Sequence, residues 1–327
     1  MELPPKLAAQ AAAQGGAFTT KQATAAGLNQ REIQRFITSG RWIRLRRSVY
    51  IEATLLPDDE ISRHILQLRA VLLCLQEEVA ASHITGAALH EFALLDPDFS
   101  LVNVTRERAG TSRTEAGVRH HDASLPSGQL TKVEGLLTTS AARTVVDLAR
   151  ELPFDAGLVA AESALNKGLT TLAELREIHE YCADWIGSRD AGRVVSFASP
   201  YSETAGETLC RIAFDVLGLP QPSQQVLIYD AAGFIARSDF LWEEQNTIGE
   251  FDGLVKYAGE DGKKAVIAEK RREDRLRQAG AQVVRFYWPE ARAKSVSIRT
   301  KTLDAFERAR YSNIPPKYRI KKQPPPR

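Results

Sequence analysis

Residues 17–52 read AFTTKQATAAGLNQREIQRFITSGRWIRLRRSVYIE, and this stretch decides how the N-terminal part of the chain folds. A first short helix ends in a turn at Gly27. Asn29 is a favoured residue to begin the next helix, and Glu32, three positions later, completes a capping-box pattern. Apolar residues within this second helix follow the i, i+3, i+4 spacing of one buried face, and Gly40 ends it. The stretch therefore predicts two short helices joined by a tight turn.

The strand pair that follows is rich in arginine. In RWIRLRRSVYIE (41–52) apolar residues alternate with arginine and tyrosine, which predicts a β-ribbon with one buried face. Residues 29–49 hold six arginines and one acid. Dense basic charge on both a helix and a ribbon is typical of a winged helix-turn-helix that binds DNA, and the alternative is a winged helix used for protein contacts alone. The expected DNA-binding residues are Gln30, Arg31, Gln34 and Arg35 on the helix and Arg41, Arg44, Arg46 and Arg47 on the wing.

Length and composition set the broad class of the protein. The chain has 327 residues with 43% hydrophobic content, which is enough for two or three domains with real cores. Its net charge of +2 says little about partners. The three cysteines are far apart, which argues against a disulfide framework or a CxxC metal site. No apolar run is long enough for a membrane span and no signal peptide is evident, so we expect a cytoplasmic protein with no membrane contact.

The order of predicted elements indicates an α/β multidomain chain. An N-terminal winged helix-turn-helix is followed by a mixed α+β middle domain and a C-terminal α/β domain. We place the boundaries at 1–54, 55–186 and 187–312, with a softer region at 187–199, and a basic, proline-rich tail at 313–327. This tail is expected to be a flexible extension. No heptad repeat supplies an obvious interface, so the oligomeric state stays open.

The N-terminal residues resemble a known family. Residues 16–53, GAFTTKQATAAGLNQREIQRFITSGRWIRLRRSVYIEA, look like the N-terminal domain of AbiEi-type antitoxins of type IV toxin–antitoxin systems. The stretches ASHITGAALHEFALL, GLLTTSAARTVVDLAR and VAAESALNKGLTT resemble the continuation of that family. The resemblance implies double-stranded DNA as a partner, repression of the protein's own operon, and a cognate toxin that is counteracted indirectly. Ser48 departs from the glycine that is common in the wing turn, and we expect only a small change of turn geometry.

The C-terminal block carries an ordered set of carboxylates. Glu207 lies on a predicted helix, four residues after Glu203 and on the same side. Asp239 lies in a predicted strand, and Glu250 and Asp252 are two apart in the next strand and therefore share a face. Carboxylates on neighbouring strands can hold Mg²⁺, which prefers hard oxygen ligands and can activate water toward a phosphodiester. We therefore name Asp239, Glu250 and Asp252 as candidate metal ligands.

This order resembles the PD-(D/E)xK nuclease superfamily, and most closely its restriction-endonuclease-like domain related to very-short-patch repair endonucleases. The similar stretches are GETLCRIAFDVLGLPQPSQQ, SDFLW, GEFDGLVKY and EKRREDRLRQAGAQVVRFYW, within residues 202–288. The resemblance implies that Glu207 is the helix acid, Asp239 the metal-bridging aspartate and Glu250 the second strand acid. The chain departs from the pattern at Asp252, where the superfamily has lysine.

Two substitutes for that lysine stay open. Lys256 could supply the charge, or Asp252 could be a further metal ligand. The charged helix that follows could also place Lys270, Arg271 or Arg275 near a scissile phosphate. The function predicted from the whole sequence is a DNA-binding, antitoxin-like protein with a nuclease-fold domain that hydrolyses DNA with Mg²⁺. The alternative is a non-catalytic autorepressor, and a winged helix argues against an RNA-directed nuclease because A-form major grooves exclude a recognition helix.

Overall fold

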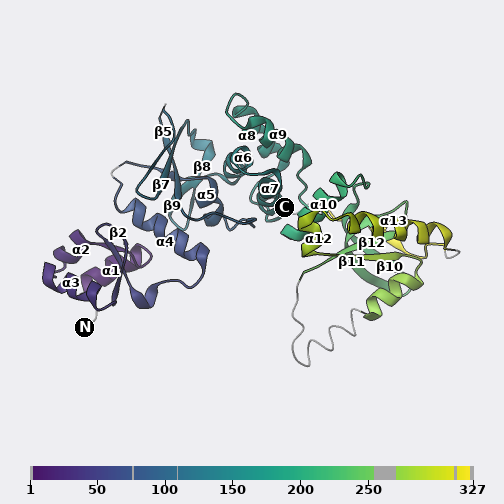
Figure 1. The fold of residues 1–327 in the computed structure, drawn as a ribbon, viewed down its shortest axis with the longest axis horizontal. Helices are drawn as coiled ribbons and strands as arrows, with labels where there is room; N and C mark the ends of the chain where they lie inside the picture. The colour runs from purple at the N-terminus through teal and green to yellow at the C-terminus, as the bar shows by residue number, and fades with distance from the viewer. Residues whose placement is uncertain (1–2, 76, 109, 254–269, 313–314, 325–327) are drawn as a thin grey trace. The chain divides into compact units, whose positions relative to one another are not determined.

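A computed structural model describes residues 3–75, 77–108, 110–253, 270–312 and 315–324 (Figure 1). Its contacts divide the chain into two compact units, Met1–Phe92 with Asp96–Leu148, and Ala93–Leu95 with Ala149–Arg327. Both units combine helices with sheets, as the predicted α/β class requires. Within the described ranges, no helix has the length and apolar character needed to cross a membrane. The domain boundaries drawn from the sequence stay predictions.

The N-terminal part of the first unit is a small helical core closed by a three-stranded sheet. Its elements are α1 (Pro5–Ala13), β1 (Phe18–Thr19), α2 (Thr20–Ala25), α3 (Gln30–Thr38), β2 (Trp42–Arg46) and β3 (Val49–Glu52). The sheet order is β1-β3-β2, with antiparallel pairing throughout. Phe18 meets Trp42 edge to face at 4.7 Å, and Phe36 stacks on Trp42 at 4.8 Å. Aromatic packing therefore fixes α3 against the ribbon.

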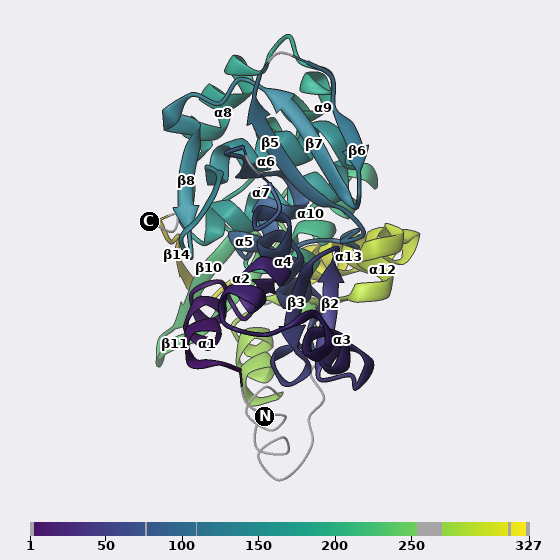
Figure 2. The same cartoon turned by 90° about the vertical axis from the view of Figure 1, so that its left-hand side faces the viewer.

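The rest of the first unit is a six-stranded sheet with helices against it. The sheet order is β6-β7-β5-β4-β9-β8, and Figure 2 shows β5 and β7 side by side in the parallel pairing that their register gives. The helices α4 and α5 contact β5. The bounds are η1 (Ala53–Leu55), α4 (Glu60–Leu72), β4 (Ala80–Ala81), α5 (His83–Leu89), β5 (Val102–Glu107), β6 (Arg113–Glu115), β7 (Val118–Ala123), η2 (Ser127–Gln129), β8 (Leu130–Val133), β9 (Leu136–Thr139) and α6 (Ala141–Glu151). The α6 helix crosses the division between the two units.

His64 on α4 predicts a pH-dependent stability of this unit. Its side chain is buried, its Nε2 contacts Thr85 Oγ1 at 2.8 Å, and burial lowers its pKa from 6.5 to about 4. Between pH 6.5 and pH 4 the His64 imidazole is protonated in the unfolded chain but neutral in the folded one. The free energy of unfolding is therefore highest above pH 6.5 and falls as the pH drops toward 4. We expect a loss on the order of 3 kcal/mol. Urea unfolding at pH 7 and pH 4.5 measures it, and His64→Gln should show a smaller difference; an equal difference would contradict the assignment.

The second unit begins with a helical layer. Its helices are α7 (Phe154–Asn166), α8 (Leu172–Tyr181) and α9 (Ser188–Phe197), and α9 packs against both of the others. The break between α7 and α8 includes Gly168. The prediction of a soft region at 187–199 is wrong, because most of it forms α9. Buried residues of α9, Ala191, Val194 and Val195, carry the apolar face that the prediction overlooked.

The remainder of this unit begins with a helix, three strands, a helix and a strand, and it ends with two helices and a short strand. The elements are α10 (Ala205–Val216), β10 (Ser223–Asp230), β11 (Gly233–Trp242), β12 (Thr247–Asp252), a helix at 270–278, β13 (Gln282–Tyr287), α12 (Trp288–Ala293), α13 (Val296–Tyr311) and β14 (Arg319–Lys321). The sheet order is β13-β12-β11-β10-β14. The β10, β11 and β12 strands form an antiparallel meander, whereas β13 runs parallel to β12.

Two separate cores stabilise this sheet. Phe214 of α10 meets Phe240, Trp242 and Phe286 edge to face at 5.1–5.2 Å, and Phe306 of α13 also meets Trp242. A second, aliphatic cluster joins strand residues to Leu276 of the 270–278 helix. Figure 1 shows α10 and α13 beside the strands. The strand aromatics Phe240, Trp242 and Phe286 are thus core residues.

The basic tail is part of the fold. Its residues 319–321 form β14, which pairs antiparallel with β10 and covers that edge of the sheet. Tyr318 and Ile320 pack on the aliphatic cluster, and Lys322 Nζ lies 2.7 Å from Glu243. The prediction of a flexible extension is therefore wrong for these residues. Without β14, the edge of β10 would expose unpaired backbone N–H and C=O groups. Pairing with β14 satisfies the hydrogen bonds of these groups.

Candidate carboxylate site and nucleic-acid interface

Glu207 is positioned by the first turn of α10. Thr204 caps this helix, and its Oγ1 donates to Glu207 Oε1 at 2.9 Å while the Glu203 N–H donates to Oε2 at 3.0 Å. A Cβ on Gly206 would collide with the Phe251 ring of β12, so only glycine lets the helix approach that strand. Glu203 itself precedes α10, and its carboxylate pairs with Arg237 at 2.6 Å. The prediction that both acids lie on the helix is therefore wrong for Glu203.

Asp239 and Glu250 lie at facing positions of neighbouring strands. The register pairs Leu241 with Ile248 and Phe240 with Gly249, so the next step of this antiparallel ladder brings Asp239 opposite Glu250. Asp239 Oδ2 accepts the Phe251 N–H at 2.8 Å. Glu207 approaches from α10, and the negative charge of Asp239 acts on it. The charges of Glu207 and Asp239 thus interact and the ladder places Glu250 opposite Asp239, but these three described acids do not bring their oxygens within 4.8 Å of one another.

Burial sets the electrostatics of this cluster. Burial, with the charge of Asp239, raises the pKa of Glu207 to about 7. Burial also raises the pKa of Asp239, against the hydrogen bond from Phe251. Both shifts mean that the ionised acids are costly as they stand, since desolvation and like charge disfavour them. Hard carboxylate oxygens are of the type that Mg²⁺ takes, but the spacing of these three acids is wider than a shared ion requires, so a metal at this site stays a prediction.

Two arginines lie against the second strand acid. Arg272 of the 270–278 helix pairs with Glu250 at 3.1 Å, and Arg285 of β13 lies 3.4 Å from Glu250 and 3.0 Å from Asp252. Contact with the same arginine confirms that Glu250 and Asp252 share a face of β12. Asp252 is held in an ion pair with Arg285, and its role as a metal ligand stays a prediction. Lys256 lies outside the described residues.

The sequence did not single out Arg272 or Arg285. Of the three cations predicted to approach the site, Arg275 pairs with Asp230 at 2.7 Å instead. Arg272 lies four residues before Leu276, which is buried against the sheet, so the i, i+4 spacing was the signal that could have found it. Arg285 pairs with Glu250 in the β12–β13 register, which no local pattern in the sequence reveals.

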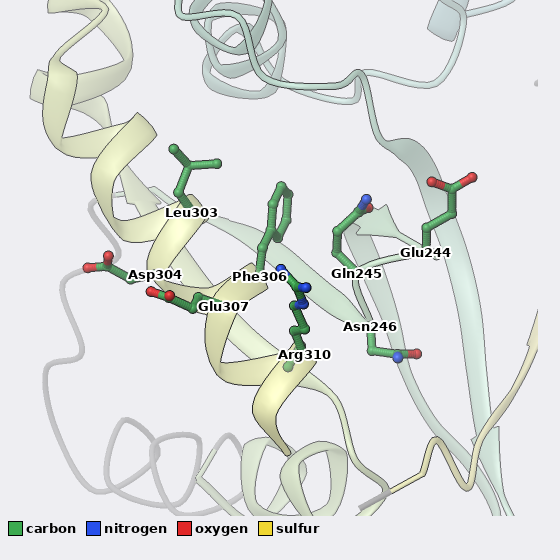
Figure 3. Close-up of a pocket in the computed structure, with 9 residues that line it drawn as sticks. Glu244, Gln245, Asn246, Leu303, Asp304, Phe306, Glu307 and Arg310 are labelled. Carbon is green, nitrogen blue, oxygen red and sulfur yellow. The ribbon is translucent and has the colours of Figure 1, made fainter. Parts of the chain in front are cut away.

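A pocket of about 500 Å³ in this unit is distinct from the carboxylates. Figure 3 shows it between α13 and the β11–β12 turn, with Phe306 and Arg310 directed toward Gln245 and Asn246. Three acids and one arginine line it, so its charge does not suit a phosphate. The lining residues are Glu244, Gln245, Asn246, Leu303, Asp304, Phe306, Glu307, Ala309 and Arg310.

In the first unit, α3 presents a polar face to solvent. Asn29 Oδ1 accepts the N–H groups of Arg31 and Glu32 at 3.0 Å, and Glu32 Oε2 accepts the Asn29 N–H at 2.8 Å. The predicted capping box is thus confirmed, and the lone acid of the stretch is engaged in it. Ile33 is buried on the inner face. The four predicted contact residues are exposed on the outer face: Gln30, Arg31, Gln34 and Arg35.

The wing carries its basic residues outside an apolar face. Ile43, Leu45, Val49 and Ile51 pack in one cluster with α4, which confirms the predicted apolar face. Tyr50, predicted on the other face with the arginines, is buried beside Trp42 in the helical core, so the prediction of a single buried face is wrong. The arginines Arg41, Arg44 and Arg47 are exposed and Arg46 is half-buried. Arg41 lies over the Phe36 ring at 5.3 Å, which ties it to α3.

Ser48 at the wing turn has a φ of 63°, in the left-handed region that favours glycine. We expect Ser48→Gly to raise the free energy of unfolding by about 1 kcal/mol because it removes this strain. The matched control is Gly40→Ser, since Gly40 has a φ of 70° and open space around its Cα. It should lower stability by a similar amount. Urea unfolding of the full-length protein measures both, and two changes of the same sign would contradict the backbone explanation.

Comparison with known proteins bears on this N-terminal region. Residues 6–53 match a family described as "Transcriptional regulator, AbiEi antitoxin". The match supports a DNA-binding, antitoxin-like regulator at the N-terminus and includes every predicted DNA-contact residue. It covers none of the carboxylate cluster, so the resemblance to PD-(D/E)xK nucleases stays a prediction.

The chain is also similar to proteins from Mycobacterium tuberculosis. "Uncharacterized protein Rv2248" of strain H37Rv and "Uncharacterized protein MT2308" of strain CDC 1551 are each 26% identical to it over 185 residues, which is 56% of this chain. The chain spans 66% of the length of these relatives. The crystal structure of the RV2827C protein is similar with a TM-score of 0.40 and 15% identity, covering 62% of this chain and 78% of that one.

Proposed function

We propose that this protein is a regulator of the AbiEi antitoxin type that binds duplex DNA through its winged helix. The observation that carries the proposal is the row of exposed polar residues on α3 beside an arginine-rich wing. The family match over residues 6–53 supports it. In this proposal α3 enters the major groove, where Gln30, Gln34 and the two helix arginines meet base edges, and the wing arginines contact phosphates.

DNA upstream of the protein's own coding sequence is the first target to test. We expect a footprint there, at lower protein concentration than on a DNA fragment of unrelated sequence. Replacing Gln34 with alanine should shrink the difference between the two fragments, because base contacts carry specificity. Equal binding to both fragments by the wild-type protein would contradict repression of its own operon.

Metal-dependent hydrolysis of DNA is a second candidate function, located in the other unit. The observation that favours it is the charge interaction of Glu207 with Asp239, with Glu250 on the facing strand, in an element order that resembles the PD-(D/E)xK nucleases. When bound, Mg²⁺ would supply Lewis-acid stabilisation and a more acidic water. The carboxylates of these three residues would hold the cation.

The arginines around the cluster would act on the substrate and on the acids. Arg272 and Arg285 already orient the Glu250 carboxylate through ion pairs. A DNA phosphate at this site would meet the same guanidinium groups, which suit phosphate oxygens by charge and geometry. In this proposal the two arginines supply the positive charge that the sequence lacks at position 252.

Plasmid DNA tests this second function directly. We expect supercoiled plasmid to be nicked by the wild-type protein with Mg²⁺ or Mn²⁺, and Asp239→Ala and Glu250→Ala to lose at least about a hundredfold in rate. Leu303→Ala, an exposed residue of α13, serves as the control and should cleave normally. Equal background nicking by all four proteins would leave a non-catalytic regulator as the function of the chain.

A toxin is the protein partner that the antitoxin proposal implies. The resemblance implies that this protein counteracts the toxin indirectly, so we expect no stable complex between the two proteins. Growth of cells that express the neighbouring gene with and without this protein tests the pairing. Toxicity that this protein does not relieve would contradict the antitoxin role and leave DNA binding intact.

A further inference from the structure

A group of three side chains outside the carboxylate cluster has the spacing of a metal site. Among the described residues, His83, His121 and Glu151 each offer one ligand atom, and these atoms lie within 4.8 Å of one another. His83 begins α5, His121 lies on β7, and Glu151 ends α6. Residues 141–148 of α6 belong to the first unit with both histidines, so the unbroken helix itself carries Glu151 to them. Two nitrogens and one oxygen are thus within reach of a single ion.

The hydrogen bonds of His121 fix which of its nitrogens can bind a metal ion. Asn103 Nδ2 donates to the Leu101 carbonyl at 3.0 Å, which assigns the other atom of this amide as Oδ1. An amide oxygen only accepts, so its contact with His121 Nε2 at 3.0 Å requires a proton on Nε2. The neutral ring therefore carries its lone pair on Nδ1. Metal-binding histidines commonly donate their second nitrogen to a neighbouring acceptor in this way.

His83 is held in a comparable way. Its Nδ1 lies 3.0 Å from Ser82 Oγ, which also accepts a hydrogen bond from Thr105 Oγ1 at 2.7 Å. Ser82 Oγ can accept the Nδ1 proton as well, and His83 then offers the lone pair of Nε2. The φ of His83 is 51°, a left-handed value that is unfavourable for a residue other than glycine, and such strain tends to collect at functional sites.

Burial and stacking favour the neutral form of both imidazoles. The His83 and His121 rings stack with their centroids 3.7 Å apart, and the two residues are only 6% and 5% exposed. Two buried imidazolium rings in contact would repel each other, whereas neutral rings are the form that binds metals. Glu151 is exposed and can supply negative charge where ions enter from solvent. A tetrahedral ion about 2.1 Å from each ligand needs ligand atoms about 3.4 Å apart, so small side-chain rotations complete the site.

We propose that His83, His121 and Glu151 form a binding site for Zn²⁺. Two imidazole nitrogens and one carboxylate oxygen are a ligand set that Zn²⁺ takes in proteins, with a fourth position left for water. Mg²⁺ and Ca²⁺ prefer oxygen ligands throughout and fit this set less well. A bound ion would tie α5, β7 and α6 together. None of these residues belongs to the winged helix or to the carboxylate cluster, so the inference does not depend on either proposed function.

Zinc binding by the full-length protein tests the site. After metal is removed by dialysis against a chelator, competition with a chromophoric zinc indicator gives the stoichiometry and the dissociation constant. We expect one Zn²⁺ per chain, and His121→Ala should weaken binding at least about a hundredfold because a ligand is lost. The matched control is His120→Ala, since His120 is the adjacent residue of β7, is also 5% exposed and points to the opposite face. This control should bind Zn²⁺ like the wild type.

A surface variant guards against a folding defect. Glu151→Gln removes only the charge of an exposed side chain, so we expect a folded protein that binds Zn²⁺ about tenfold more weakly. Glu115→Gln removes an exposed acid from β6 and should have no effect. Zn²⁺ should also raise the midpoint of thermal unfolding of the wild type and of His120→Ala, because an ion that binds the folded state stabilises it. The midpoint of His121→Ala should not move.

Three results would overturn the site. A wild-type protein that binds no Zn²⁺ at millimolar concentration contradicts it directly. Equal losses in His120→Ala and His121→Ala would show that zinc binds to histidines without regard to this geometry. Unchanged binding by a folded Glu151→Gln would remove the third ligand, and the two histidines alone would not make the proposed site.

Discussion

Replacing the wing arginines Arg44, Arg46 and Arg47 with glutamine is expected to lower the affinity for duplex DNA by about 100- to 1000-fold at 0.1 M salt. Each arginine that contacts a phosphate releases a counterion, which makes binding stronger as the salt concentration falls. The wing holds these side chains at the surface, and its apolar face is anchored on α4. Removal of the charges should therefore weaken binding with little change in fold.

The dependence of affinity on salt makes this prediction sharper. Each phosphate that an arginine neutralises contributes about 0.9 to the slope of log affinity against log salt, so removing three arginines should make the slope shallower by about 2.7. Fluorescence anisotropy of a labelled duplex at several salt concentrations measures the slope. Unlike the slope, the preference between two sequences should change little, because phosphate contacts carry no sequence information directly.

A matched control removes the same charge elsewhere. Arg299, Arg308 and Arg310 lie on the exposed surface of α13, and their replacement with glutamine changes the net charge by the same amount. We expect this triple variant to retain DNA affinity within about threefold. If its affinity fell as far as that of the wing variant, the winged helix would not be the main DNA-binding surface.

The second large effect is expected at Glu162 in the core of the second unit. This carboxylate of α7 is fully buried and pairs with Arg211 of α10. It also accepts the Ser199 N–H at 2.9 Å and Thr208 Oγ1 at 2.8 Å. Glu162→Gln would leave the Arg211 charge buried without its counter-charge, so we expect unfolding of this unit to become easier by about 3–5 kcal/mol.

A compensating double variant tests the cause. Glu162→Leu with Arg211→Met replaces the ion pair by apolar groups, and its stability should return to within about 2 kcal/mol of the wild type. Three of the four tryptophans, Trp185, Trp242 and Trp288, belong to this unit, so tryptophan fluorescence during urea unfolding reports mainly on it. A double variant less stable than Glu162→Gln would show that the hydrogen-bonding geometry matters more than the charge.

Local sequence patterns were sufficient for the winged helix. Its helix ends depend on caps such as Asn29 and Glu32, and its ribbon depends on the alternation of apolar and basic residues. These signals extend over three or four residues, so a short stretch of sequence is enough to recognise them. The same holds for β11 and β12, since Asp239 and Glu250 lie in two successive strands as predicted.

Local patterns did not predict the contacts between segments that are distant in the sequence. The α9 helix was overlooked because its apolar face is short, and the tail was expected to be flexible because its composition is basic and proline-rich. Pairing with β10 decides the structure of the tail, since an exposed strand edge binds a partner strand whose own sequence has little strand character.

The sequence alone determined most of the elements, α9 and β14 excepted, and named the acids of the candidate site, because caps, periodicity and motif spacing are local properties. The tertiary structure alone decided what surrounds those acids. Strand register brings Arg285 beside Glu250, and helix packing brings Arg272 to the same carboxylate. Arg272 is 22 positions from Glu250, so only the packing of the 270–278 helix on the sheet brings the two side chains together. The charge balance of the candidate site is therefore a property of the folded chain.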